Sequence, residues 1–232
     1  MENTNNNNKD KNTGLLKFYR RNWYSVGLIL FIALSFFMGF LGSDFSRIQV
    51  ILIYSFMALL IHQFEEYAYP GGFPSIFNTA VLGEKKVPER YPINANQALI
   101  TNVFLGYPFY LLAIFLPNFI WLGLAQVFFG MAQLIVHGIV VNVRLKSLYN
   151  PGLAAVVFLH WPIGIYYIWY VTTNNLANTG DFIIGIIVTI IAAIVIIMLP
   201  LRLSASKESK YPFSEAEMGG FAKQKVDKIR KS

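Results

Sequence analysis

The sequence predicts an all-α, polytopic membrane protein: a bundle of six transmembrane helices with both termini in the cytoplasm. Of its 232 residues, 55% are hydrophobic and 13% are charged, whereas about a quarter of the residues in an ordinary soluble domain are charged. The mean hydropathy is +0.48, and most of the 19 basic residues gather near the two ends of the chain. This distribution argues against a soluble enzyme and against nucleic-acid binding. The chain has no cysteine, which excludes disulfides, thiolate zinc sites and cysteine nucleophiles.

The chain begins with a polar segment that offers nothing to bury. We therefore expect a disordered leader over residues 1–14, a six-helix transmembrane domain over residues 15–201, and a basic cytoplasmic tail over residues 202–232. The first apolar stretch follows the leader, and no small-residue cleavage pattern ends it, so it is expected to be retained as a span. In the tail, apolar residues recur near helical spacing between basic ones. This pattern predicts either a short amphipathic helix on anionic headgroups or a solvated charged segment.

Six apolar stretches, each about 20 residues long, can cross a hydrocarbon core as helices. They cover residues 23–41, 48–67, 93–116, 119–143, 152–171 and 182–200. The positive-inside rule then orients them, because the two termini and the loops 68–92 and 144–151 carry every Lys and Arg except Arg47. These segments are expected on the cytoplasmic side of the cell membrane.

All three histidines fall inside predicted spans: His62 in the second, His137 in the fourth and His160 in the fifth. Glu65 and Glu66 are the only acidic residues in any span. Ionisable side chains in a bilayer are costly unless they face protein or water, so each one marks a candidate functional site. A rise of 1.5 Å per residue places the imidazoles roughly 8, 9 and 12 Å from the cytoplasmic ends of their spans. Three helices thus place a histidine in one layer.

The polar residues also share helix faces. His62, Glu65 and Glu66 are neighbours on the second span, because residues three and four positions apart lie on one face. A second stripe follows the fourth span, formed by Gln126, Gly130, Gln133, His137 and Arg144. We therefore expect one shared site with catalytic residues Glu65 and Glu66, metal ligands His62, Glu66, His137 and His160, and supporting residues Gln133, Asn102 and Arg144.

A simpler interpretation applies to some of these residues. A histidine or glutamate near a helix end can reach the headgroups, and a buried Gln or Asn often only joins helices by hydrogen bonds. For His160 alone, or Gln126 alone, we favour that interpretation. The common depth of three imidazoles beside two carboxylates favours a shared site for the whole set.

The run His62-Gln63-Phe64-Glu65-Glu66 resembles the signature of the HXXEE family, small bacterial multi-span proteins named for that motif. The resemblance extends over the second to fifth spans. It implies the fold but little chemistry, because that family is uncharacterised.

The layout also resembles that of CAAX-type intramembrane proteases, whose sites combine a Glu-Glu pair on one helix with histidines from two others. This resemblance implies the adjacent glutamates as the pair and His137 and His160 as the imidazoles. The chain departs from that pattern in having Pro70 where the family has Arg, and Asn142 five rather than four residues after His137. The resemblance is one of layout only.

Imidazole and carboxylate ligands without thiolate suit a divalent metal, Zn²⁺ first, with one position left open for water. The second glutamate would then serve as general base. A di-iron centre is less favoured, because such centres recruit more carboxylates than the spans contain. Without metal, a buried glutamate could still activate water or carry protons.

The leading functional prediction is a metal-assisted intramembrane hydrolase that acts on a lipid, a lipidated peptide or a membrane peptide bond. Its partners would be membrane lipids and a lipid-like or membrane-peptide substrate. The competing prediction is a proton- or ion-coupled small transporter or a solute-binding membrane protein, although the chain is short and shows no inverted repeat. A third is a structural membrane protein whose polar residues only join helices. The sequence predicts no oligomeric state.

Overall fold

The computed structural model describes the backbone of residues 2–231 and the side chains of residues 14–231, and no strand occurs in that range. Six helices are long and apolar enough to cross a membrane, which confirms the predicted all-α, six-helix fold class. These spans, numbered one to six below, are Gly14–Asp44, Arg47–Tyr67, Ala95–Phe115, Ile120–Leu145, Leu153–Thr173 and Thr179–Ser204. Residue 1 of the expected leader lies outside the described residues, and the disorder predicted for residues 1–14 stays a prediction.

The first two spans are simple and the last four are interrupted. Helix α1 (Glu2–Leu41) begins before span one, which consists of α1 from Gly14 onward and the 3-10 turn η1 (Gly42–Asp44); span two is α2 (Arg47–Tyr67). Span three consists of α4 (Ala95–Leu99), η3 (Ile100–Gly106) and α5 (Tyr107–Phe115). Span four consists of α6 (Ile120–Leu134), η4 (Ile135–Val141) and α7 (Asn142–Leu145). Span five consists of α8 (Leu153–Ala155), η5 (Val156–His160) and α9 (Trp161–Thr173). Span six consists of α10 (Thr179–Ala192), η6 (Ala193–Met198) and α11 (Leu199–Ser204).

The interruptions η3, η4, η5 and η6 are π-helical segments, and proline explains three of them. A proline inside a helix lacks an N–H, and its ring crowds the carbonyl group four residues earlier. Pro108, Pro162 and Pro200 each stand in the first turn after η3, η5 and η6 respectively. The wider turn therefore lies where the ring would otherwise crowd the backbone. No such proline follows η4.

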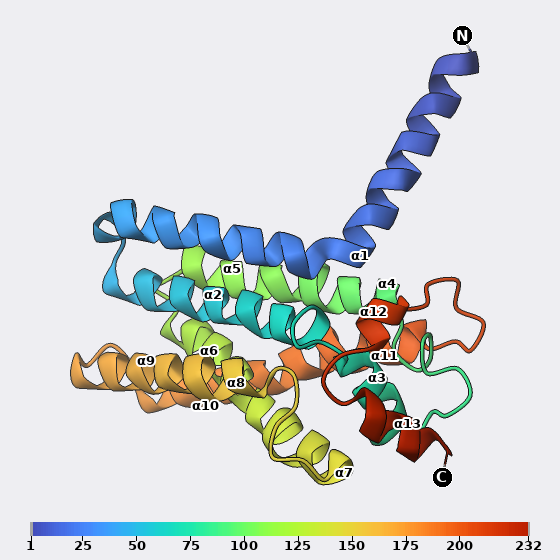
Figure 1. Ribbon diagram of the computed structural model, residues 1–232. Helices are drawn as coiled ribbons and strands as arrows, with labels where there is room; N and C mark the ends of the chain where they lie inside the picture. Colours follow the sequence, from blue (N-terminus) through green and yellow to red (C-terminus); the bar gives the residue numbers. More distant parts are fainter. Residues whose placement is uncertain (1, 232) are drawn as a thin grey trace.

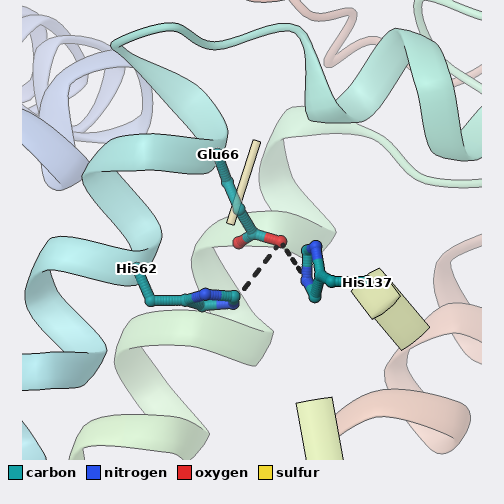
Figure 2. A group of neighbouring side chains, drawn as sticks. All are labelled: His62, Glu66 and His137. Atoms are coloured by element: carbon teal, nitrogen blue, oxygen red, sulfur yellow. Dashed lines mark ion pairs between the residues drawn. The ribbon is translucent and has the colours of Figure 1, made fainter. Parts of the chain in front are cut away.

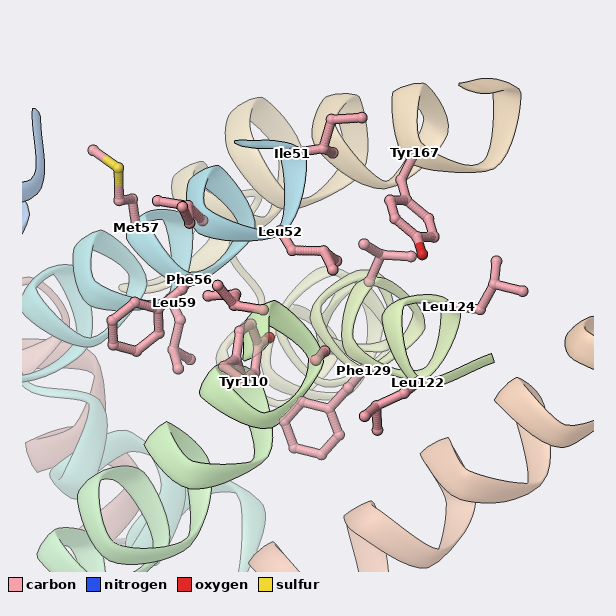
Figure 3. Close-up of a cluster of buried hydrophobic side chains, with 14 of the residues drawn as sticks. Ile51, Leu52, Phe56, Met57, Leu59, Tyr110, Leu122, Leu124, Phe129 and Tyr167 are labelled. Atoms are coloured by element: carbon pink, nitrogen blue, oxygen red, sulfur yellow. The ribbon is translucent and has the colours of Figure 1, made fainter. Parts of the chain in front are cut away.

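Helix α6 lies at the centre of the bundle, packed against α9 and α10, while α2 packs against α1, α5 and α6 (Figure 1). Figure 3 shows the resulting core, in which Leu52 and Phe56 of α2 meet Tyr110 of α5, Phe129 of α6 and Tyr167 of α9. Each of these side chains is buried. Spans one and six contribute least to the core, and their exposed faces are apolar, as expected for helices that face lipid.

Small residues and polar side chains join the helices. Gly185 of α10 brings its backbone against Leu124 of α6, and a Cβ there would meet the Leu124 Cβ at 2.9 Å. Buried Gln126 donates from Nε2 to the Leu52 carbonyl across the bundle at 2.9 Å. Such bonds hold helices together in a membrane, and Gln126 has that role here.

Both ends of the described chain lie at the same end of the bundle, which we call the basic end (Figure 1). There the tail forms α12 (Glu215–Met218) and α13 (Lys223–Lys231), which pack on α3 (Phe73–Ile76) and the π-helical segment η2 (Phe77–Val81). Ala222 and Val226 are buried in one apolar cluster with α3, so these apolar residues of the tail face protein. The placement of this end in the cytoplasm stays a prediction.

That placement can be tested with two topology reporters. A reporter fused after Ser232 should report the cytoplasm, because the basic end carries nearly all the Lys and Arg residues. One inserted at Asn175, in the turn between α9 and α10, should report the opposite side. A same-side result for both reporters would contradict the six-span topology.

Candidate metal and catalytic site

Three buried side chains from two spans converge near the basic end. His62 and Glu66 stand one turn apart on α2, and His137 comes from η4 of span four. Glu66 Oε1 lies 3.7 Å from His62 Nε2 and 3.4 Å from His137 Nε2 (Figure 2). Ligand atoms of the three residues all lie within 4.8 Å of one another, and each residue is at most 5% exposed. The three side chains can therefore hold a metal ion.

Hydrogen bonds at the other ring nitrogens of the two histidines fix the tautomer of each ring. His62 Nδ1 lies 3.0 Å from the Gly152 carbonyl oxygen, and His137 Nδ1 lies 2.8 Å from Asn150 Oδ1. The orientation of the Asn150 amide follows from its Nδ2, which donates to the His137 carbonyl and to Asn142 Oδ1 at 2.7 Å each. Because both oxygens can only accept, each Nδ1 must carry the proton. A neutral ring then presents a bare Nε2 lone pair to Glu66.

The two Nε2 lone pairs and the Glu66 carboxylate together require a positive charge between them. Two nitrogen lone pairs and a carboxylate oxygen repel one another in a buried site, unless a cation or added protons lie between them. The distances of 3.4 and 3.7 Å exceed those of ordinary N–H···O bonds. They approach the separation of about 3.4 Å between neighbouring N and O ligands around a tetrahedral Zn²⁺. Histidines that ligate metals also donate their second N–H to a carbonyl in this way.

Gly152, in the turn before span five, brings its backbone against both histidine rings. Gly152 has φ +102°, which an L side chain rarely adopts. A Cβ there would lie 2.5 Å from His137 Cε1 and 2.9 Å from His62 Cε1. Only glycine thus allows the turn to approach both rings while its carbonyl accepts from His62.

The adjacent glutamate has a different role. Glu65 Oε1 accepts from Tyr149 Oη at 2.7 Å and from the Ala154 amide at 3.1 Å, and its Oε2 accepts from the Ala155 amide at 2.8 Å. These amides belong to the first turn of α8, so Glu65 caps the N-terminus of span five. Burial and the bond to Glu65 raise the pKa of Tyr149, which keeps its hydroxyl a donor. The two glutamates predicted as one catalytic pair therefore face different elements.

His160 is buried beside this group but is not part of it. Its ring centroid lies 5.8 Å from that of His62, and its Nδ1 faces Gly130 of α6. Its Nε2 has no hydrogen-bond partner within the described part of the chain. The structure thus places the third predicted imidazole next to His62, outside the set of atoms that could share one ion.

A pocket of about 830 Å³, its open mouth included, extends from the three residues into the bundle. Its wall is mostly apolar, with Leu59, Tyr110 and Phe129 among the lining residues. Segments η3, η4 and η6 all contribute to this wall. Phe73 of α3 closes one side by stacking on the His137 ring, with centroids 5.1 Å apart.

The supporting residues predicted from the sequence divide into two groups. Asn102 and Gln133 line the pocket, and Asn102 Oδ1 accepts from Gln63 Nε2 at 3.3 Å. Arg144 is exposed on α7 and does not reach the site. The predicted stripe assumed a continuous α-helix, but η4 lies between Gln133 and Arg144. Its extra residue per turn rotates the helix that follows, so Arg144 leaves the face that carries His137.

Several residues of the site were not predicted. Asn150, Gly152 and Tyr149 orient the histidines or Glu65, and all three lie in the loop before span five. The run Asn150-Pro151-Gly152 is a turn signal, which indicates a loop but not what the loop contacts. Gln97 and Thr101 also line the pocket, and Gln97 Nε2 donates to Thr101 Oγ1 at 2.9 Å.

Comparison with known proteins gives one match. A family model described as "Protein of unknown function with HXXEE motif" matches residues 53–167. This range contains most of span two, spans three and four, and span five as far as Tyr167, with all the site residues described above. No curated protein and no solved structure gives a significant match to the chain.

The different roles of the two glutamates can be tested with a matched pair of variants. Glu65→Gln should lower the free energy of unfolding by about 1–3 kcal/mol, because an amide donor would then face the backbone amides of α8. Glu66→Gln should leave the stability of the metal-free protein unchanged or raise it, because the amide removes a charge that faces two lone pairs. Thermal melting in detergent measures both effects. Glu66→Gln as the more destabilising change would contradict this assignment.

Proposed function

The chain belongs to the HXXEE family, whose function is unknown, and we propose that it is a metal-assisted intramembrane hydrolase. The observation that carries the proposal is the convergence of His62 Nε2 and His137 Nε2 on Glu66 at the wall of an apolar pocket. The chain has six helices that could span a membrane, and the residues of this group lie on two of them. Ionisable groups within membrane-spanning helices are costly in lipid, so a buried group of this kind is a candidate functional site.

Zn²⁺ is the metal that we propose. Two imidazoles and one carboxylate match the donor set of catalytic zinc sites, which keep the fourth position open. A divalent ion held there supplies Lewis acidity and lowers the pKa of a bound water. His62 and His137 would bind the ion through Nε2, and Gly152 and Asn150 hold the two rings in the orientation that this requires.

Glu66 is the carboxylate of this donor set, and we also assign it to proton transfer. Its Oε1 faces the imidazoles, and its Oε2 is the atom proposed to accept a proton from water in the pocket. Glu65 is unsuited to this role because its oxygens accept three hydrogen bonds from Tyr149 and α8. Only Glu66 of the adjacent pair therefore faces the histidines.

The pocket favours a lipid-like substrate with a neutral ester or amide. Its lining contains no Lys, Arg or Asp, and Glu66 is the single acidic residue among the described residues that form it. Buried Gln97 Oε1 has no partner there and could accept from a polar group of the substrate. Apolar chains would lie along Tyr110 and Phe129.

We place the entrance between spans four and six. Gln133 and Val136 of span four and Ile197 and Leu201 of span six line the pocket and are only half-buried. The two spans pack closely where α6 and α10 cross, and they diverge toward the basic end (Figure 1). An opening there faces the bilayer, so a lipid or lipidated peptide could enter sideways without leaving the membrane.

Metal content provides the first test. The purified chain should carry about one divalent ion, and His137→Ala should abolish its binding. Asn150→Ala should lower the affinity about 10- to 100-fold, because it frees the His137 ring without removing a ligand. Gln133→Ala is the matched control, because Gln133 lines the pocket and no described hydrogen bond joins its side chain to either histidine, so the metal affinity should be unchanged. Wild-type affinity in both His137→Ala and Asn150→Ala would exclude the metal site.

Hydrolysis provides the second test. Metal-loaded protein in micelles should cleave a labelled neutral acyl ester or amide lipid, and chelation should abolish cleavage. Glu66→Gln should lower the rate at least 100-fold, whereas Glu65→Gln, once folded, should keep most of it. Loss of activity with Glu65→Gln but not with Glu66→Gln would refute the assigned roles. Proton flux in vesicles that survives chelation would instead support the competing transporter.

A further inference from the structure

A second pocket, separate from the metal and catalytic site, lies at the basic end where span one begins. It has a volume of about 940 Å³, its open mouth included, and none of its lining residues belongs to the first pocket. Three segments form it: the first turns of span one, the start of α4 at Ala95, and tail residues 210–212. We call it the basic pocket. Its lining residues are Leu16, Lys17, Arg20, Arg21, Ala95, Lys210, Tyr211 and Pro212.

The basic pocket holds four cationic side chains and no carboxylate. Lys17, Arg20 and Arg21 stand three and four residues apart on α1 and share one face, and Lys210 approaches from the tail. Within the described side chains none of the four forms an ion pair. Arg21 interacts electrostatically with Glu217, but Glu217 is buried and its Oε2 caps α12 by accepting from Ser214. Four like charges at one pocket repel one another until an anion joins them.

Arg20 is held in position rather than free in solvent. Its Nε donates to Asn96 Oδ1 at 3.0 Å, and its guanidinium lies 4.4 Å from the centre of the Tyr211 ring. No described hydrogen bond uses its two terminal nitrogens. A fixed guanidinium with two free nitrogens matches the geometry of a phosphate, which it binds through two parallel hydrogen bonds.

The tail is also held against this place. The Ala95 amide donates to the Tyr211 carbonyl at 3.0 Å, and the Phe213 amide donates to the Glu89 carbonyl at 2.7 Å. Phe213 is buried in an apolar cluster with Trp23 of span one. Lys210 and Tyr211 therefore line the pocket because the backbone around them is anchored.

We propose that the basic pocket binds the phosphate diester of an anionic membrane lipid. Leu15, Leu16 and Phe18 surround the basic residues on α1 and are more than half exposed, which suits the acyl region of a bilayer. Leu16 also lines the pocket itself, so apolar and cationic groups meet there as they do in a phospholipid binding site. A soluble phosphate compound has no apolar chain that could contact these leucine and phenylalanine side chains.

Native mass spectrometry of the full chain in detergent micelles tests the proposal. Phosphatidylglycerol, added at low mole fraction, should be retained in preference to phosphatidylcholine with the same acyl chains. Lys17→Gln with Lys210→Gln should weaken phosphatidylglycerol binding about fivefold for each charge removed. Both side chains are exposed and make no described hydrogen bond, so the variant should fold. Arg20→Lys should also weaken binding, because it keeps the charge but loses the two parallel N–H donors of the guanidinium.

The control removes the same charge elsewhere. Lys223→Gln with Lys228→Gln alters two exposed positions of α13 and should change binding by less than about twofold. Equal losses in the two double variants would show diffuse attraction and overturn the proposal. Equal retention of phosphatidylcholine, or complete displacement of phosphatidylglycerol by millimolar inorganic phosphate, would also overturn it. None of these results bears on the metal site, which shares no residue with the basic pocket.

Discussion

A buried carboxylate must be matched by positive charge or by hydrogen-bond donors, and Glu66 is the residue around which this protein meets that requirement. Two imidazoles approach Glu66 Oε1, but the oxygens of Gly152 and Asn150 occupy their Nδ1 protons. A neutral ring held in this way cannot donate to Glu66. The surrounding structure thus excludes the simplest solution, a neutral histidine that donates to the carboxylate. A cation between the three side chains would match the carboxylate and use both nitrogen lone pairs.

Helix geometry separates the two glutamates of the motif. Adjacent residues on an α-helix point about 100° apart, so two neighbouring carboxylates cannot face one target equally well. Glu66 faces the histidines, and Glu65 faces the first turn of span five. The motif therefore joins two functions on a single turn of α2, since one glutamate faces the candidate site and the other fixes the helix that carries the nearby turn. Gly152 links the two, because it lies between the capped helix and both rings.

The sequence predicted the six spans, and the predicted site included the three side chains that could share an ion, although it placed Glu65 and His160 in the same group. The lengths of the apolar stretches identified all six spans. The similar distances of His62, Glu66 and His137 from the ends of their spans predicted that the three residues meet. Both predictions depend only on a regular rise per residue along a helix. The face of a helix on which a residue lies was harder to predict wherever the helix was not a regular α-helix. Arg144 lies outside the site because η4 changes the rotation of span four. No proline stands in the first turn after η4, so nothing in the sequence indicated this π-helical segment. Asn150 was missed because a loop residue has no periodicity from which its partner could be inferred.

The contact between Glu65 and span five also constrains how the protein enters the membrane. Glu65 precedes the amides that it caps by 89 and 90 residues, which at about 5–20 residues per second corresponds to roughly 5–20 s of synthesis. During that interval the carboxylate has no partner, and an unpaired charge is strongly disfavoured in hydrocarbon. Span two would therefore rest with its Glu65 end in the aqueous interface and move to its final depth only when span five arrives. The second helix would then complete its insertion only after the fifth has been synthesised.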